Sequence, residues 1–164
     1  MLETILLYGE EKRDAESHIH RVVGSWGLAL PDVEPDILHF GYGDYPRFGL
    51  AEFNIANNLE QGYCGKLMFM FAGQTCPTHH HAVKHETFFV VRGSVDMDLN
   101  GRGLVLHQGV TLVVGQGDRH RFTAREDSLL LECSRPDLME DSIFEDPEIN
   151  RAVQLEIARQ GEDA

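Results

Sequence analysis

The spacing of hydrophobic residues changes along the chain. Near the beginning, over 10–26, apolar side chains recur every three or four positions: Ile19, Val22, Val23 and Trp26. This spacing, with acidic residues near the start, predicts an amphipathic helix. A second helix is expected over 147–160, because Pro147 suits a first helical turn and Gly161 follows the end.

Between these helices the hydrophobic period becomes two. Over 94–99, apolar residues alternate with Ser or Asp, which indicates a strand with one face toward water. The following Asn100-Gly101 pair is a strong signal for a hairpin turn. Short runs bounded by Gly, Pro or Asn are typical of an all-β barrel or sandwich. We expect strands over 47–55, 63–72, 86–92, 94–99, 103–107, 110–114, 119–124 and 127–134.

The length of 164 residues suits one domain, expected to span 1–164 and to be mainly β. A helical N-terminal segment is expected over 1–46, and its later part is loop-rich because Pro and Gly recur there. The barrel is expected over 47–135. An acidic loop and the last helix follow over 136–164.

The formal net charge of −13 argues against nucleic acid or an anionic membrane as a partner. No apolar run approaches the roughly 18 residues of a membrane span, and no basic flank marks a signal peptide. Three cysteines without a CxxC pair favour reduced thiols and a cytoplasmic location. We expect Cys64 and Cys133 to pack as small hydrophobic residues.

Histidines and one carboxylate form the strongest chemical signal. His79 and His81 are two residues apart, so on a strand both point to one side while His80 points away. Glu86 begins the next expected strand, and His120 comes from a distant one. Three nitrogens and one oxygen suit a divalent Mn, Fe, Co, Ni or Zn ion with open positions. We therefore expect one metal ion on His79, His81, Glu86 and His120.

These residues lie in two longer motifs. The stretch from Gly73 to Gly93 resembles the first cupin motif, G-x5-H-x-H-x3,4-E-x6-G, at each defined position. The stretch from Gly109 to Ala124 resembles the second motif, G-x5-P-x-G-x2-H-x3-N. It has Gly115 in place of Pro and Ala124 in place of Asn, and neither change removes a ligand. The resemblance implies a jelly-roll barrel, the double-stranded β-helix of cupins.

A longer part of the chain resembles the D-lyxose ketol-isomerases. The segment 63–88 contains YC-x-K-x-L, GQTCP-x-H-x-H and K-x-ETF, and the segment 132–149 contains ECS and DSIFEDPEI. The resemblance implies a manganese-dependent isomerase that interconverts D-lyxose and D-xylulose, or D-mannose and D-fructose, through a cis-enediol. One departure is a short connection, since only Ala82 and Val83 separate the second histidine of the motif from Lys84.

Aldose–ketose interconversion requires a base at carbon and a Lewis acid on the sugar oxygens. Glu132 is the candidate base, because a carboxylate inside LLLEC is costly unless it is used or paired. Lys66, on an apolar strand, is the candidate that stabilises an oxyanion. Lys84 and Asp141 are candidate substrate-binding residues. The alternatives are solvent-facing positions for Glu132 and the lysines, and a capping or pocket-closing role for Asp141.

Two other functions remain open at this stage. One is a sugar-binding cupin module without catalysis, of the kind associated with sialic-acid-type sugar metabolism. The other is a mononuclear iron dioxygenase, whose four ligands would look the same. Glu132 and Lys66 favour the isomerase, since an oxygenase needs no base at carbon. The expected partners are a small sugar and a second copy of the chain, because barrels with long strand edges often pair.

Overall fold

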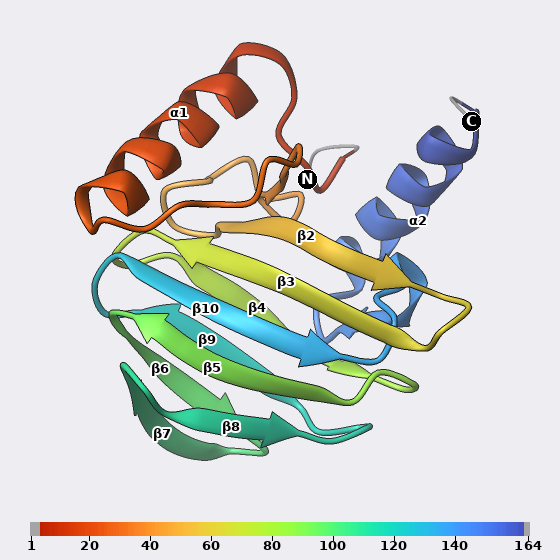
Figure 1. Ribbon diagram of the computed structural model, residues 1–164. Coiled ribbons are helices and arrows are strands. Elements are labelled where there is room, and N and C mark those ends of the chain that lie inside the picture. Colours follow the sequence, from red (N-terminus) through yellow and green to blue (C-terminus); the bar gives the residue numbers. More distant parts are fainter. Residues whose placement is uncertain (1–3, 163–164) are drawn as a thin grey trace.

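The computed structural model describes residues 4–162, which form two antiparallel sheets and two helices (Figure 1). The six-stranded sheet has the order β1 (Asp36–Leu38), β2 (Leu50–Asn58), β3 (Tyr63–Met70), β10 (Ser128–Ser134), β5 (Glu86–Arg92) and β8 (Thr111–Val114). The five-stranded sheet has the order β11 (Ser142–Phe144), β4 (Thr75–His81), β9 (His120–Ala124), β6 (Ser94–Leu99) and β7 (Arg102–His107). The helices are α1 (Gly9–Ser25) and α2 (Pro147–Glu162), and a short 3-10 turn, η1 (Met139–Asp141), precedes β11.

The expectation of a mainly β fold with helices toward both ends is confirmed. All eight expected strands occur, with boundaries within three residues of the predicted ones. Three further strands were absent from the predicted set. Two of them, β1 and β11, are only three residues long and sit at sheet edges, so their own sequences carry little strand signal. The third, β4, contains Pro77, a residue depleted in strands, and three consecutive histidines, which show no hydrophobic alternation.

The predicted hairpin turn at Asn100-Gly101 is confirmed. Asn100 and Gly101 have φ angles of 54° and 80°, and they connect β6 to β7. Positive φ at both central residues is the mark of the turn whose twist matches that of the flanking strands. This hairpin fixes the register in which Met97 lies opposite Leu104.

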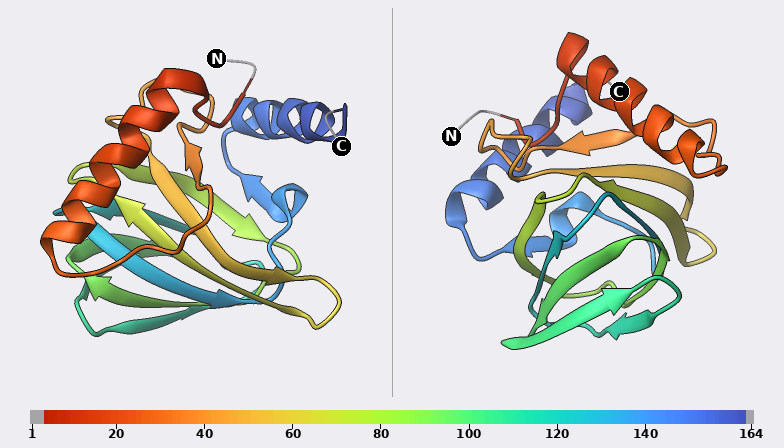
Figure 2. Two further views of the ribbon diagram at one scale, coloured as in Figure 1. Left: turned by 45° about the horizontal axis from the view of Figure 1, so that its top comes forward. Right: turned by 90° about the vertical axis from the view of Figure 1, so that its left-hand side faces the viewer.

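The interior of the barrel is filled by inward-facing residues of both sheets, among them Met68, Phe88, Met97, Phe122 and Leu130. A second apolar cluster lies outside the barrel, where α1 covers one end of the six-stranded sheet (Figure 2). In that cluster Ile19 and Val23 pack with Phe53, Phe69 and Leu129. Each fully buried side chain of this size contributes about 1.5–3 kcal/mol. The predicted apolar face of the first helix is therefore the face that binds the sheet.

The second helix lies beside the mouth of the barrel. Its start is capped by Asp146, whose carboxylate accepts a hydrogen bond from the Glu148 amide at 2.9 Å. Farther along, the buried Glu156 accepts hydrogen bonds from the hydroxyls of Thr4 and Tyr8. These contacts tie α2 to the beginning of the described chain. Neither helix has the combined length and apolarity that crossing a membrane requires.

Candidate active site

Three buried histidines meet inside the barrel. His79 and His81 lie on β4, and His120 lies on the neighbouring β9, directly opposite His79. One potential ligand atom from each ring lies within 4.8 Å of the other two. His80 has the opposite parity on β4 and is half-exposed, as the alternation of the strand predicts. The triad can bind a metal ion.

The backbone orients each of these rings. Every Nδ1 atom lies near a carbonyl oxygen: His79 to Pro77 at 2.8 Å, His81 to Asp141 at 3.1 Å, and His120 to Asp118 at 3.1 Å. Since a carbonyl only accepts hydrogen bonds, Nδ1 carries the proton and Nε2 keeps its lone pair. This is the usual arrangement around metal-binding histidines. His120 Nε2 is buried without a hydrogen-bonding partner among residues 4–162, as expected of an atom that binds a ligand from outside the chain.

The electrostatic surroundings favour neutral rings. Burial lowers the pKa of His79 well below its ordinary value, and the neighbouring His120 and His81 lower it further. Burial also lowers the pKa of His120. A neutral imidazole is the form that binds a metal, so both rings are in the binding form at neutral pH.

Glu86 lies beside the triad at the start of β5. Its side chain is almost fully buried, and Oε1 lies 2.6 Å from His81 Nε2. Burial would raise the pKa of Glu86, but a hydrogen bond from His81 together with the Lys84 ammonium lowers it. When the only proton of the His81 ring is on Nδ1, that hydrogen bond is lost, and Nε2 and the carboxylate present lone pairs to each other. A cation beside both atoms would relieve their repulsion, so the donor set fits a metal site.

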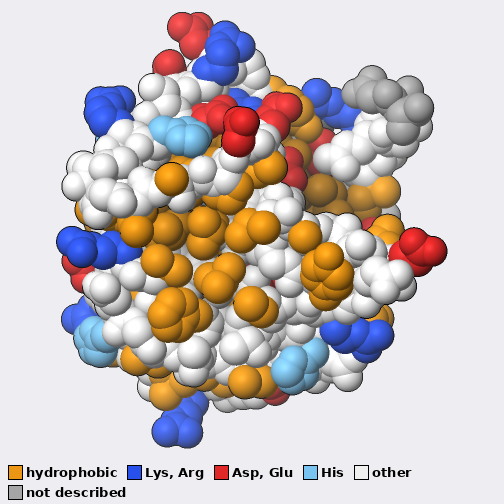
Figure 3. Space-filling model, in the orientation of Figure 1, with side chains coloured by type: hydrophobic (Ala, Val, Ile, Leu, Met, Phe, Trp, Pro, Cys, Tyr) orange, Lys and Arg blue, Asp and Glu red, His pale blue; other side chains and the backbone are white. Residues whose placement is uncertain are grey.

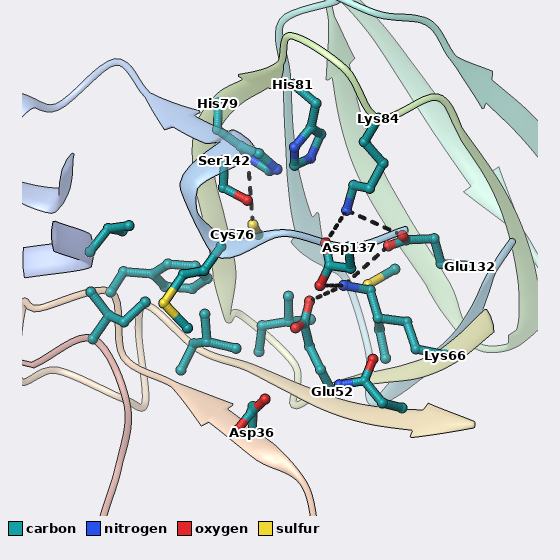
Figure 4. Close-up of a pocket in the computed structure, with 18 of the residues that line it drawn as sticks. Asp36, Glu52, Lys66, Cys76, His79, His81, Lys84, Glu132, Asp137 and Ser142 are labelled. Carbon is teal, nitrogen blue, oxygen red and sulfur yellow. Dashed lines mark hydrogen bonds and ion pairs between the residues drawn. The ribbon is translucent and has the colours of Figure 1, made fainter. Parts of the chain in front are cut away.

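Two buried lysines share three carboxylates next to this site (Figure 4). Lys66 Nζ lies 2.9 Å from Glu52 and 3.0 Å from Asp137. Lys84 Nζ lies 2.8 Å from Asp137 and 3.3 Å from Glu132. Glu132 also lies 3.6 Å from Lys66. Lys66, Lys84 and Glu132 are each only 2–3% exposed, so the solvent-facing alternatives for these side chains are wrong.

The carboxylates determine the charge state of both lysines. Burial would lower the pKa of Lys66, but Asp137, Glu132 and Glu52 raise it well above its ordinary value. Lys84 behaves in the same way: burial and Lys66 oppose its charge, and the surrounding carboxylates still raise its pKa. Both side chains therefore remain ammonium ions in an interior where unpaired charge would be costly.

Sequence reasoning missed Glu52 and Asp137. Glu52 lies on β2 with its side chain toward the interior, in a strand whose pattern resembles any half-buried strand. Asp137 follows the last long strand, in a stretch that reads as an acidic loop. The side chain of Asn57 holds this loop, because it pairs with the backbone nitrogen and oxygen of Asp137 at 2.9 and 2.8 Å. Only the folded chain brings these carboxylates to the lysines.

Asp141 serves the short connection between β4 and β5. Its carboxylate accepts hydrogen bonds from the backbone amides of Ala82, Val83 and Lys84 at 2.8–3.2 Å. Its backbone carbonyl faces His81 Nδ1. The observed contacts of Asp141 therefore position a loop and a candidate ligand. Its predicted contact with substrate stays a prediction.

All these groups except Asp141 and His120 line one cavity of about 260 Å³. Its polar lining includes His79, His81, Glu86, Lys66, Lys84, Glu132, Glu52 and Asp137. Its apolar lining includes Phe40, Leu38, Leu50, Met139, Phe144 and, from α2, Val153. The volume lies just below the range of about 300–1,000 Å³ for small-molecule sites. The candidate base, the lysines and two histidines of the triad, His79 and His81, thus face one space suited to a small ligand.

Residues 66–132 match the model of a family described as Cupin domain. The D-lyxose/D-mannose isomerase of Thermosediminibacter oceani is 24% identical over 182 aligned residues, covering 92% of this chain and 99% of that protein. A D-lyxose ketol-isomerase of a Thermofilum species is 25% identical, with the same two coverages. The fold is similar to that of Acinetobacter L-ribose isomerase, solved with L-ribose: the TM-score is 0.67, with 14% identity and 83% of each chain covered. The chain thus contains a cupin domain and is a distant relative of curated D-lyxose ketol-isomerases.

Proposed function

We propose that this chain is a metal-dependent sugar isomerase that interconverts D-lyxose and D-xylulose and, more slowly, D-mannose and D-fructose. One observation carries the proposal. An inward-facing carboxylate and two inward-facing ammonium groups line the same cavity as His79 and His81, two members of the histidine triad. A binding module has no need for a base at carbon, and neither has an oxygenase. The distant similarity to D-lyxose isomerases over 92% of the chain supports the substrate class.

The proposed metal site consists of His79, His81, Glu86 and His120, and the proposed metal is Mn²⁺. The three free Nε2 atoms and the buried carboxylate are the donors on which this assignment rests. A bound divalent ion supplies Lewis-acid polarisation of the sugar oxygens at C1 and C2. The carbonyls that hold the three Nδ1 atoms keep the rings in the binding orientation.

The proposed base is Glu132, which removes the proton from C2 of the aldose and returns a proton to C1 of the resulting cis-enediol. Its carboxylate receives hydrogen bonds from Ser134 Oγ at 2.8 Å and Lys84 Nζ at 3.3 Å, which fix its orientation. Lys66 and Lys84 stabilise negative charge that develops on the sugar oxygens, because both are cations in a dry cavity. The proposed role of Asp141 in substrate binding is to hold the loop that carries Lys84.

The test is turnover by purified protein after elemental analysis and loading with Mn²⁺. D-lyxose should yield D-xylulose, and in D₂O deuterium should appear at the former C–H position. Glu132→Gln should retain the metal and lose at least about 100-fold in kcat, since general bases contribute about 10²–10⁴. Glu126→Gln is the matched control. The Glu126 carboxylate accepts a hydrogen bond from the Ser94 hydroxyl, and neither residue lines the cavity.

Full retention of the substrate hydrogen, or normal turnover by Glu132→Gln, would refute proton transfer through Glu132. Binding of a five- or six-carbon sugar without turnover would favour the sugar-binding module. Oxygen consumption by iron-loaded protein with an organic substrate, in the absence of sugar turnover, would favour the dioxygenase.

A further inference from the structure

The six-stranded sheet carries charged residues on its inner face. Its outer face has mainly hydrophobic and uncharged side chains (Figure 3). On β3 and β10 the inward Lys66 and Glu132 line the cavity, whereas Leu67 and Leu131, the next residue of each strand, lie opposite each other on the outer face. An antiparallel sheet normally turns its polar residues toward water and its apolar residues inward. This reversal sets the inner polar residues apart from a plain apolar core.

These polar residues follow one another across the sheet. In strand order they are Asp36 on β1, Glu52 and Asn54 on β2, Lys66 on β3 and Glu132 on β10. Asp36 lies opposite Glu52, Asn54 lies opposite Lys66, and Lys66 lies opposite Glu132. The next strand, β5, carries the carboxylate of the proposed metal site. The row therefore begins beside that site and ends at Asp36 (Figure 4).

An unpaired buried atom lies on this row at Asn54. Four buried side-chain oxygen or nitrogen atoms lack a hydrogen-bonding partner among residues 4–162. Two of them, Glu86 Oε1 and His120 Nε2, belong to the proposed metal site, and Tyr45 Oη lies outside the cavity lining. The fourth is Oδ1 of Asn54, which lines the cavity. Burying an unpaired acceptor is costly, so its place in a cavity wall indicates a hydrogen-bond donor supplied by a ligand.

Asp36 presents a second polar group near Asn54. Asn54 is two residues beyond Glu52, the register partner of Asp36, so the two side chains are diagonal neighbours on adjacent strands. Diagonal neighbours lie about 7–8 Å apart, a gap that one hydroxyl group can bridge. Burial raises the pKa of Asp36, although Lys12 and Lys66 act in the opposite direction. A protonated carboxyl group donates one hydrogen bond, whereas the Asn54 oxygen only accepts.

We propose that Asn54 and Asp36 bind the C5 hydroxyl group of the sugar, and that they make the site select sugars that carry it. This inference rests on the proposed function, which places C1 and C2 between the metal and Glu132. The rest of the sugar then extends past the lysines toward β2 and β1, because the metal site occupies the other end of the row. The C5 hydroxyl donates a hydrogen bond to Asn54 Oδ1 and accepts one from Asp36.

The other polar residues of the row are less suited to this selection. The ammonium group of Lys66 already contacts Glu52 at 2.9 Å and Asp137 at 3.0 Å. A sugar hydroxyl that approaches these groups must compete with a buried ion pair. Binding to Asn54 and Asp36 instead supplies a partner to an acceptor that lacks one, and a sugar without the C5 hydroxyl leaves that acceptor unpaired.

The experiment compares kcat/KM for D-lyxose and for 5-deoxy-D-lyxose, which lacks only the C5 hydroxyl, in Mn²⁺-loaded wild type and variants. The preference of each variant is divided by that of wild type, so the different ring equilibria of the two sugars cancel. Asn54→Ala and Asp36→Ala should each lower the preference for D-lyxose about 10-fold, and turnover of 5-deoxy-D-lyxose should change less than about 2-fold. Asp36→Asn should retain most of the preference, because its amide also donates.

Asn57→Ala is the matched control. Asn57 lies on the same strand and lines the same cavity, but its side chain pairs with the backbone of Asp137. Its loss should slow both sugars by the same factor. If Asn54→Ala also slows both sugars equally, Asn54 acts only on the structure and the inference is wrong. Turnover of D-lyxose with an unchanged preference in both alanine variants would overturn the inference and leave the proposed function intact. A wild type that converts neither sugar would overturn both.

Discussion

The carboxylate of Asp137 bridges the two buried lysines, and Asp137→Asn tests what this bridge contributes. The amide retains the shape of the side chain, but its nitrogen cannot accept a hydrogen bond. One of the two lysines must then face a donor instead of an acceptor. The shorter contact, 2.8 Å to Lys84, is the larger loss, since the other carboxylates near Lys84 lie 3.3 and 3.6 Å away.

The size of the effect follows from the environment. Breaking a buried ion pair by removing one partner costs about 3–5 kcal/mol. Asp137 is 20% exposed, and each lysine retains other carboxylates, so the cost should lie at or just below the lower end of this range. We expect the free energy of unfolding to fall by about 2–3 kcal/mol, which corresponds to a Tm lowered by roughly 4–12 °C for a chain of this length.

Urea denaturation of the wild type and three variants measures this loss. Asp96→Asn is the control, because Asp96 and its partner Arg125 are half-exposed or more and 3.8 Å apart; its effect should stay within about 0.5 kcal/mol. Combining Asp137→Asn with Lys84→Met should restore part of the stability, because the double variant leaves no unpaired cation at Lys84. If Asp137→Asn is as stable as Asp96→Asn, the bridge does not stabilise the fold and this reasoning is refuted.

The same carboxylate predicts a dependence on acid. Burial would raise the pKa of Asp137, but Lys66 and Lys84 hold it below the ordinary carboxyl range. A carboxyl whose pKa is lower in the folded chain binds its proton first in the unfolded chain. Its contribution to stability is therefore complete above about pH 4 and is lost as the pH falls further. Asp137→Asn should show a shallower loss of stability below pH 4 than the wild type.

Three further substitutions test other contacts. Asp141→Ala should lower the free energy of unfolding by about 2–4 kcal/mol, since three amides lose a charged acceptor. It should also weaken Mn²⁺ binding about 10-fold in a metal titration, because the backbone carbonyl that orients His81 loses the side-chain contacts that hold it in place. Burial lowers the pKa of His39, so wild type should lose stability as the pH falls below about 6.5, and His39→Gln should lose less in parallel denaturation curves. Gly93→Ala should lower Tm, because Gly93 has φ +84° and a Cβ there would lie 2.4 Å from a side chain, while Gly103→Ala, with open space, should not.

The sequence predicts those features whose signal is local. The alternation of apolar and polar residues over 94–99, followed by Asn100-Gly101, predicted the hairpin of β6 and β7. The alternation of side chains along a strand predicted that His80 points away from His79 and His81. Asp137 could not be found in this way, because its partners Lys84 and Lys66 are 53 and 71 residues away in the chain. Parity also fails where both faces of a strand are apolar. Strand β10 contains LLLEC, so the sequence does not tell which leucines face the core. Cys133, expected to pack as a small hydrophobic residue, is exposed.

The charges around the cavity explain why a site so rich in carboxylates is compatible with a stable interior. Five carboxyl groups, Asp36, Glu52, Glu86, Glu132 and Asp137, line the cavity together with two ammonium groups. Burial raises the pKa of Asp36, which favours its neutral form. The lysines offset two of the other four negative charges. A divalent ion at the triad would offset the remaining two, so the loaded cavity would be close to neutral. A neutral cavity leaves no surplus charge to attract a charged ligand, and it presents many hydrogen-bonding groups. An uncharged polyhydroxylated molecule such as a free sugar meets both conditions.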